Sequence, residues 1–256
     1  MIKTQWIGLW TMTRKETLRI FRIWTQTLLP SVISTSLYFL IFGSFIGSRI
    51  GLIGEVTYLQ FIIPGLVMMS VITNAYSNVV ASVYSAKFQR NIEELLVSPL
   101  TSTVILLGYI IGGVMRGVIV GFLVFLVSLY FTALPMTHPM IAITTIIGTA
   151  ILFSLLGFVN AIFARKFDDI AIVPTFVLTP LTYLGGLFYS IKDLPLIWQK
   201  ISFFNPILYL VNSFRYGFLG ISDISVSVAI ISMGVLIGVM WCVALFLLHR
   251  GIGLRQ

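Results

Sequence analysis

Charged side chains are scarce in this chain of 256 residues, of which 9% are Asp, Glu, Lys or Arg and 58% are hydrophobic. An average soluble domain carries about 25% charged residues. A chain this apolar has too little polar surface to stay dissolved. The composition therefore excludes a soluble enzyme, a disordered chain and a free nucleic-acid-binding protein, and it predicts a polytopic membrane protein.

Cysteine and histidine are almost absent as well. The one cysteine, Cys242, excludes a disulfide framework, a CxxC redox centre and a thiolate metal site. The two histidines, His138 and His249, have no second ligand nearby in the sequence, so we expect no metal and no cofactor in this chain. HExxH, GxSxG and paired carboxylates within an apolar run are also missing, and we expect no catalytic residues.

Uncharged stretches divide the chain into segments long enough to cross a bilayer, which takes about 20 residues. They predict an all-α protein with six transmembrane helices, at 28–47, 59–84, 103–131, 140–163, 170–190 and 226–248. Residues 201–214 are uncharged too, but they number only 14 and contain Pro206. We therefore predict a re-entrant or interfacial helical hairpin over 194–219. The whole chain, 1–256, is expected to form one transmembrane domain.

The distribution of Lys and Arg predicts the orientation. With the N-terminus inside the cell, eleven basic residues fall on the cytoplasmic side, and four (Arg49, Lys192, Lys200 and Arg215) fall outside. Because cytoplasmic loops carry the excess of basic residues, both termini are predicted to be cytoplasmic. We attribute the net charge of +8 to loops that lie on anionic lipid, not to nucleic-acid binding.

Residues 3–24 have the pattern of an amphipathic helix that lies on the membrane surface. Apolar residues recur there at spacings near three and four, with basic residues between them: Trp6, Leu9, Trp10, Leu18, Phe21 and Trp24, interleaved with Arg14, Lys15, Arg19 and Arg22. This is the pattern of an interfacial helix. A merely basic tail before the first span is the alternative.

No acidic residue falls inside a predicted span. The eight acids are Glu16, Glu55, Glu93, Glu94, Asp168, Asp169, Asp193 and Asp223. Ion-driven transporters usually keep an acid or a histidine within the bilayer, and a nucleotide-binding GxxxxGK[ST] pattern is missing too. If the protein moves a substrate uphill, another polypeptide must therefore supply the energy.

The loop between the second and third spans contains a candidate docking helix at 86–98. As a helix it would place Phe88, Ile92, Leu95 and Leu96 on one face, with Lys87, Arg90, Glu93 and Glu94 elsewhere. An apolar ridge framed by charge suits insertion into a cleft on a soluble subunit. A short helix resting on lipid headgroups is the alternative. The turn at Asp168 and Asp169 is expected to be solvated, and a second subunit contact there is the less favoured interpretation.

Several residues inside the predicted spans have two interpretations each. Arg116 either lines a translocation path or pairs with polar groups of the second span. Polar residues of the second span either hydrogen bond to other helices or line the substrate path: Ser70, Asn74, Ser77, Asn78 and Ser85. The glycines at 113, 117 and 121 permit close helix packing, within the chain or at a dimer seam.

Two prolines, Pro174 and Pro180, should bend the fifth span because each removes a backbone donor. Hydroxyl-bearing side chains are expected to hydrogen bond to the carbonyls that this frees. The candidates are Thr175, Thr179, Thr182 and Tyr183.

The ordered set of motifs resembles the type-2 ABC transporter permeases, the membrane subunits of bacterial ABC exporters. "FQRNIEELLVSPLT" looks like the coupling helix of that family, and residues 178–220 are similar to its C-terminal signature. The signature residues stand here as Asn205-Pro206, Tyr209 and Arg215-Tyr216, in the predicted hairpin.

The resemblance implies a homodimer in the bacterial inner membrane, bound to two ABC ATPase subunits that carry the ATP and Mg. It implies outward export of a hydrophobic or amphipathic substrate, such as a drug, a lipid or a lipid-linked glycan. The coupling residues would be Phe88, Arg90, Ile92, Glu93, Glu94 and Leu95. The path or gate residues would be Asn74, Asn78, Arg116, Thr179, Thr182, Tyr183 and Phe188. A stand-alone channel or an assembly scaffold without active transport is the alternative.

Overall fold

The computed structural model describes residues 2–53 and 56–253. Glu55, one of the eight acids, and Arg255, one of the eleven basic residues assigned to the cytoplasmic side, lie outside these ranges. The first helices are α1 (Ile2–Arg22), α2 (Trp24–Thr27), α3 (Leu29–Leu40), a π-helical turn η1 (Ile41–Ile46) and α4 (Gly47–Ile50). Strands β1 (Leu52–Ile53) and β2 (Val56–Thr57) form an antiparallel pair.

The remaining helices follow the strand pair. They are α5 (Tyr58–Phe88), α6 (Asn91–Val97), α7 (Ser102–Phe131), α8 (Pro139–Phe163), α9 (Asp169–Val173), the π-helical turn η2 (Pro174–Leu178), α10 (Thr179–Tyr183), a short 3₁₀ turn η3 (Ile191–Asp193), α11 (Leu196–Phe203), α12 (Pro206–Leu219) and α13 (Val226–Arg250). Within the described residues, the protein is all-α apart from this strand pair.

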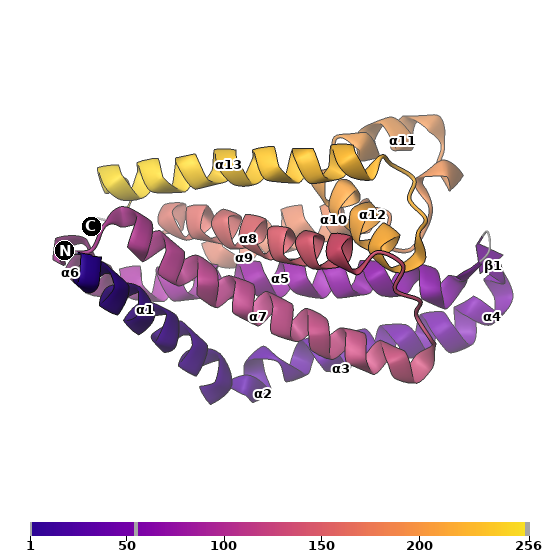
Figure 1. The fold of residues 1–256 in the computed structure, drawn as a ribbon, viewed down its shortest axis with the longest axis horizontal. Helices are drawn as coiled ribbons and strands as arrows, with labels where there is room; N and C mark the ends of the chain where they lie inside the picture. The colour runs from indigo at the N-terminus through magenta and orange to yellow at the C-terminus, as the bar shows by residue number, and fades with distance from the viewer. Residues whose placement is uncertain (1, 54–55, 254–256) are drawn as a thin grey trace.

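The long helices lie side by side along the long axis of the molecule (Figure 1). The N-terminus, α6 and the end of α13 lie at one end, which we call the terminal end. α4, β1 and α11 lie at the opposite end. Successive long helices run between these two ends, as expected of a polytopic membrane protein.

In the part of the chain that the structure describes, five helical segments are long and apolar enough to cross a membrane. They are Trp24–Gly43, Tyr58–Phe88, Ser102–Phe131, Pro139–Phe163 and Val226–Arg250. They coincide closely with five of the six spans that the sequence predicts, the first beginning a few residues earlier. The all-α polytopic prediction is confirmed to this extent.

The segment predicted as a span at 170–190 is shorter in the structure. Its apolar helical part is Asp169–Tyr183, which at 1.5 Å per residue is about 22 Å long, against a hydrocarbon core of about 30 Å. The chain turns after Tyr183, where Gly186 takes a positive φ of 72°. Absence of charge did not reveal this end, because the turn that follows is uncharged as well.

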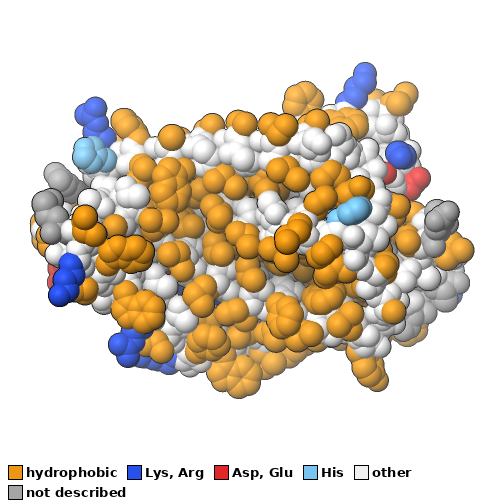
Figure 2. All heavy atoms as spheres, in the orientation of Figure 1, with side chains coloured by type: hydrophobic (Ala, Val, Ile, Leu, Met, Phe, Trp, Pro, Cys, Tyr) orange, Lys and Arg blue, Asp and Glu red, His pale blue; other side chains and the backbone are white. Residues whose placement is uncertain are grey.

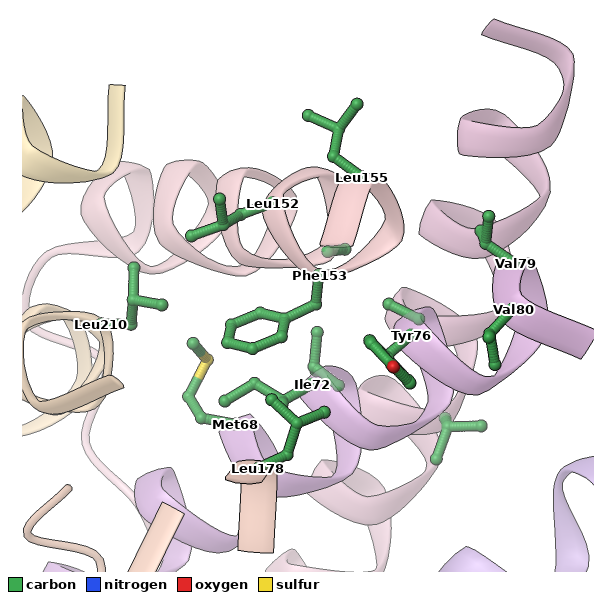
Figure 3. Close-up of a cluster of buried hydrophobic side chains, with 14 of the residues drawn as sticks. Met68, Ile72, Tyr76, Val79, Val80, Leu152, Phe153, Leu155, Leu178 and Leu210 are labelled. Atoms are coloured by element: carbon green, nitrogen blue, oxygen red, sulfur yellow. The ribbon is translucent and has the colours of Figure 1, made fainter. Parts of the chain in front are cut away.

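The core of the bundle forms where α5 packs against α8 and α7. Figure 3 shows Met68, Ile72 and Tyr76 of α5 facing Phe153 of α8, and all four side chains are buried. Gly157 of α8 permits this close approach, because a Cβ there would lie 2.6 Å from the carbonyl oxygen of Tyr76. α5 is therefore the central helix of the fold.

The three glycines of α7 pack against α5, which decides between the two interpretations given above. A Cβ at Gly113 would lie 2.5 Å from Val79, and one at Gly117 would lie 2.9 Å from the Cβ of Ala75. A Cβ at Gly121 would lie 2.6 Å from Val71. Because each contact is within the chain, the ridge serves packing inside the subunit.

Apolar side chains cover the middle of the visible face, and Lys and Arg gather toward its two ends (Figure 2). α13 contributes large exposed residues to the apolar surface: Val228, Ile231, Val235, Val239 and Phe246. An apolar band between two charged ends suits a molecule whose middle faces lipid.

α1 packs on α7 with a face that the sequence pattern did not indicate. Its buried residues are Met12, Glu16 and Ile20, spaced by four. The predicted apolar stripe faces outward instead, with Trp6, Trp10, Leu18, Phe21 and Trp24 exposed. The reason is steric, because Gly108 and Gly112 of α7 leave room for Met12 and Glu16. A Cβ at Gly108 would lie 2.7 Å from the Cβ of Met12, and one at Gly112 would lie 2.6 Å from the Cβ of Glu16.

Candidate functional site

The predicted docking helix at 86–98 is divided in the structure. α5 continues through Phe88, the chain turns at Gln89 and Arg90, and α6 begins at Asn91. Arg90 has a φ of 62°, a left-handed conformation that ends a right-handed helix. Phe88 and Ile92 therefore belong to different helices and do not share a face.

The division changes which of the predicted coupling residues reach the surface. Phe88 is 63% exposed, and Arg90, Glu93 and Glu94 are exposed as well. Ile92 is 1% exposed and belongs to the core, whereas Leu95 is half-buried. Of the predicted coupling residues, the surface near α6 thus presents one aromatic side chain beside charged groups, not the continuous apolar ridge of an unbroken helix.

Lys87 holds this turn against the end of α8. The side chain is buried, and its Nζ donates to the carbonyl oxygens of Ile162 at 2.7 Å and Ala164 at 2.8 Å. A lysine at the carboxyl end of a helix satisfies carbonyl groups that have no partner within the helix. The Tyr84 hydroxyl adds a bond to the carbonyl oxygen of Arg165 at 3.2 Å. The end of α5 and the end of α8 are therefore joined.

Phe167, in the loop between α8 and α9, completes the surface, and the sequence interpretation missed it. Its ring packs edge-on against Tyr84 and Phe88, with centroids 4.8 and 5.1 Å apart. Phe167 is 53% exposed. We call the exposed residues Phe88, Arg90, Glu93, Glu94, Val97 and Phe167 the α6 surface.

Asp169 shapes the loop that carries Phe167. Its carboxylate accepts the backbone N–H groups of Arg165 at 2.7 Å and Lys166 at 2.9 Å. These donors favour the ionised form and hold the pKa of Asp169 below its usual value. The Asp169 side chain thus closes the turn by accepting hydrogen bonds from two backbone N–H groups.

α1 also holds the chain that follows α6. The Gln5 side chain donates to the carbonyl oxygen of Pro99 at 2.6 Å and accepts the backbone N–H of Thr101 at 3.0 Å. A Cβ at Gly8 would come into contact with the side chain of Leu100. The α6 surface is therefore attached to α1, α5 and α8 at once.

Further along the bundle, Arg116 makes the contacts of the structural alternative. Its Nε donates to Asn74 Oδ1 at 3.2 Å, and its Nη2 donates to the carbonyl oxygen of Thr27 at 3.2 Å. Asn74 lies on α5, in the predicted second span, as that alternative required. Arg116 thereby joins α7 to α5 and to the α2–α3 junction.

The polar stripe of α5 faces α3 and α1. The Asn74 amide donates to Ser31 Oγ at 2.8 Å, and the Ser70 and Thr35 hydroxyls are 3.2 Å apart. The Nη2 of Arg19 donates to Asn78 Oδ1 at 2.9 Å. Hydrogen bonding between helices therefore accounts for most of the stripe.

Glu16 lies outside the predicted spans, as expected, but the sequence pattern did not indicate that it is buried where α1 packs on α7. It is 1% exposed, accepts the Ser82 hydroxyl at 2.6 Å and pairs with Arg19 at 2.9 Å. The sequence feature that could have indicated this burial is the four-residue spacing of Gly8, Met12, Glu16 and Ile20. Met12 and Glu16 lie against Gly108 and Gly112 of α7.

Hydroxyl groups of the predicted fifth span bond to its own backbone. Thr179 Oγ1 donates to the carbonyl oxygen of Pro174 at 2.9 Å, and Thr182 Oγ1 donates to that of Leu178. Neither acceptor is a carbonyl that a proline frees, which would be that of Ile170 or Phe176, four residues before each proline, so these two bonds are not the ones expected. The prolines accompany the π-helical turn η2, which divides the segment.

Tyr183 and Phe188 belong to an aromatic cluster with α3 and η1. The Phe188 ring lies 4.8 Å from that of Phe42, 5.9 Å from Tyr183 and 6.3 Å from Tyr38. Tyr38 of this cluster also lines a cavity of about 210 Å³, most of whose lining residues carry a hydroxyl group: Ser31, Ser34, Thr35, Tyr38, Ser70 and Thr73.

The signature residues of the predicted hairpin fix the two helices that the structure has there, α11 and α12. The side-chain oxygen of Asn205 caps α12 by accepting the backbone N–H of Ile207 at 3.0 Å. Its Nδ2 donates to the carbonyl oxygen of Leu181 at 2.6 Å. Pro206 follows in the first turn, where its missing N–H costs nothing. The Tyr209 hydroxyl donates to the carbonyl oxygen of Phe203 at 2.9 Å.

The Arg-Tyr pair attaches α12 to the rest of the bundle. Arg215 is buried and donates to the carbonyl oxygens of Phe61 and Gly186. The Tyr216 ring stacks on that of His138, with centroids 4.7 Å apart and planes 10° apart. The pair therefore connects α12 with α5 and with the loop before α8.

The fold and these contacts define a class of membrane protein. The chain matches the ABC-2 type transporter family over residues 8–219, and it belongs to that family. It is a permease subunit, a multi-pass protein of the inner membrane whose ATPase is a separate polypeptide. Over 256 residues it is 52% identical to the inner membrane transport permease YadH of Escherichia coli strain K12, with 100% of both chains covered.

More distant relatives cover nearly the same length. The chain is 26% identical over 255 residues to nodulation protein J of Rhizobium leguminosarum bv. viciae, which covers 96% of this chain and 94% of that protein. It is 24% identical over 217 residues to nodulation protein J of Sinorhizobium fredii strain NGR234, covering 82% of this chain and 79% of that one.

Proposed function

We propose that the protein is the permease of an ATP-driven exporter, active as a homodimer with two ATPase subunits. It would move a hydrophobic or amphipathic substrate outward, such as a drug, a lipid or a lipid-linked glycan. Membership of the ABC-2 family implies that the permease works with an ATPase. The docking site of that ATPase is assigned to the α6 surface, because this surface is partly apolar and is attached to α1, α5 and α8.

The proposal includes six crossings of the membrane, with both termini in the cytoplasm. The sixth crossing would use α9, η2 and α10, extended by the chain that follows Tyr183. The common location of the N-terminus, α6 and the end of α13 supports an even number of crossings (Figure 1). The excess of basic residues on this side supports its cytoplasmic location.

The ATPase would bind the α6 surface through Phe88 and the charged residues Arg90, Glu93 and Glu94. Exposed aromatic side chains of this kind commonly supply much of the binding energy at an interface. Because Lys87 and Gln5 hold the ends of the segment, movement of α6 would displace α5, α8 and α1 together.

The substrate path is proposed along α3, α5 and α10. Tyr183 and Phe188 would offer aromatic surface, and the hydroxyl-lined cavity at Tyr38 would accept polar groups. Arg116, Asn74 and Asn78 would hold the surrounding helices in position. The hairpin of α11 and α12 would gate the far end.

Co-purification with the cognate ABC ATPase tests the docking assignment. Phe88→Ala combined with Glu94→Ala removes an aromatic anchor and a charge from the α6 surface. We expect complex recovery and permease-stimulated ATP hydrolysis to fall at least about tenfold, since interface anchors are worth 2 kcal/mol or more.

Phe122→Ala is the matched control, because Phe122 is 55% exposed on α7 and belongs neither to the α6 surface nor to the proposed path or gate. It should leave both measurements unchanged. If the Phe88 and Glu94 double variant retains complex formation and stimulated hydrolysis, the docking assignment is wrong. If the permease binds no ABC ATPase under any condition, the channel or scaffold interpretation is favoured instead.

A further inference from the structure

A cavity of about 320 Å³ lies at the end of the molecule opposite the termini, beside α12. Three of the side chains that line it are charged, Arg215, Lys192 and Asp223, and the amide of Asn212 and the hydroxyl of Ser222 lie among them. The family assignment and the docking proposal make no use of this cavity.

The positive charge of Arg215 has no carboxylate partner within the described residues. Its Nε donates to the carbonyl oxygen of Phe61 at 3.2 Å, and its Nη2 donates to that of Gly186 at 2.6 Å. The guanidinium also lies 3.8 Å from the centre of the Phe61 ring. Nη1 has no hydrogen-bond partner among those residues, although Arg215 is 1% exposed. Neutral carbonyls and a ring orient this cation without neutralising it.

The carboxylate nearest to this cation already has its own partners. Asp223 accepts the Ser190 hydroxyl at 2.9 Å and the backbone N–H of Ile191 at 3.3 Å. Its Oδ1 also lies 3.7 Å from the Nζ of Lys192. The cavity therefore holds two cations against one carboxylate, and that carboxylate is committed to the turn at Ser190.

Buried charges in proteins are normally paired, and a guanidinium matches the planar oxygens of a carboxylate or a phosphate. We propose that this cavity binds an anionic group, a carboxylate or a phosphate, between Arg215 and Lys192. Arg215 would supply the free Nη1 donor, and the flexible, exposed Lys192 would close over the group from solvent. Asn212 and Ser222 would offer further donors. The site requires no ATPase, so its test is independent of the proposed export function.

The test measures thermal unfolding of the purified full chain in neutral detergent. Inorganic phosphate is titrated against chloride at matched ionic strength, and acetate is the carboxylate probe. We expect saturable stabilisation by phosphate or by acetate. Lys192→Gln should weaken the apparent affinity about 2- to 5-fold, as for a largely exposed ion pair.

Lys200→Gln is the matched control, because it removes the same charge from α11 at the same end but does not line the cavity. It should leave the affinity unchanged. Arg215→Gln should abolish saturation. If that variant fails to fold, the comparison of Lys192→Gln with Lys200→Gln still decides.

A lipid headgroup and a free anion are distinguished by repeating the measurement in nanodiscs of phosphatidylglycerol or phosphatidylcholine. Stabilisation that depends on Lys192 and appears with phosphatidylglycerol but not with free phosphate or acetate identifies a lipid headgroup. Stabilisation by phosphate or acetate in neutral detergent identifies a soluble anion. A cavity filled by water would show no saturation with any probe, and that result, or an equal response of the two lysine variants, overturns the proposal.

Discussion

Replacing Glu16 by glutamine tests whether the ion pair between Glu16 and Arg19, which lies within α1, stabilises the packing of α1 on α5 and α7. The substitution preserves the shape of the side chain and an oxygen that can accept the Ser82 hydroxyl. It removes the negative charge that lies 2.9 Å from Arg19. Arg19 would then present an uncompensated charge to the groove between α1 and α5.

The expected magnitude follows from the partners that remain. Removing one member of a fully buried ion pair costs about 3–5 kcal/mol. The Arg19 side chain is 31% exposed and still donates to the backbone and side-chain oxygens of Asn78, so water and Asn78 recover part of that cost. We expect a loss of about 1–2 kcal/mol in the free energy of unfolding, since a hydrogen bond to a charged group contributes about 1.5–3 kcal/mol. For a chain of this size, this corresponds to about 2–8 °C in melting temperature.

A double-mutant cycle isolates the pair. Glu16→Gln, Arg19→Gln and the double variant are compared by thermal unfolding in detergent, and we expect a coupling energy above about 0.5 kcal/mol. Glu93→Gln is the control because the same chemical change is made there at an exposed position on α6. It should stay within about 0.5 kcal/mol of the original protein.

The reasoning is refuted if Glu16→Gln melts together with the Glu93→Gln control. It is equally refuted if the cycle gives a coupling energy of zero, because the two side chains would then not interact. A loss of stability with zero coupling would show that Glu16 acts through Ser82 instead.

Two further substitutions test contacts of α7. Arg116→Gln should lower the melting temperature by about 2–8 °C, because two hydrogen bonds between helices are lost, while complex formation with the ATPase is retained; unchanged stability with abolished transport would assign Arg116 to the path instead. Gly112→Ala should cost about 1–3 kcal/mol in unfolding experiments, because the added Cβ would lie 2.6 Å from that of Glu16. Gly238→Ala on α13 meets no atom within 4 Å and should be neutral or slightly stabilising.

The spans could be predicted because a bilayer imposes a simple rule, about 20 residues with almost no charge. That rule placed the helix of Ser102–Phe131 to within one residue, and it found the start of Tyr58–Phe88 but ended that helix four residues early. It could not find the end of α10, because the turn after Tyr183 is made by uncharged residues and by the positive φ of Gly186. The absence of charge indicates that a segment lies in lipid, but it does not indicate where the helix in that segment ends.

The docking helix shows a second limit of the sequence pattern. Helical periodicity assumes an unbroken helix, and the left-handed conformation of Arg90 breaks it. That conformation is unusual for arginine, and no residue preference announces it. The turn depends on contacts from outside the segment, above all the bonds of Lys87 to α8, so the local sequence could not predict that Ile92 is buried.

Glu16 and Arg116 have a common physical explanation. Apolar surface does not drive helices together within lipid, because the tails are as apolar as leucine. Small residues and hydrogen bonds must then determine which helices pack and in what register. Gly112 of α7 lets α1 approach, and the bonds of Glu16 and Arg116 determine how α1 and α3 sit against α5 and α7. Glu16 and Arg116 thus lie where the first helices meet α5 and α7, and their hydrogen bonds help to specify that contact.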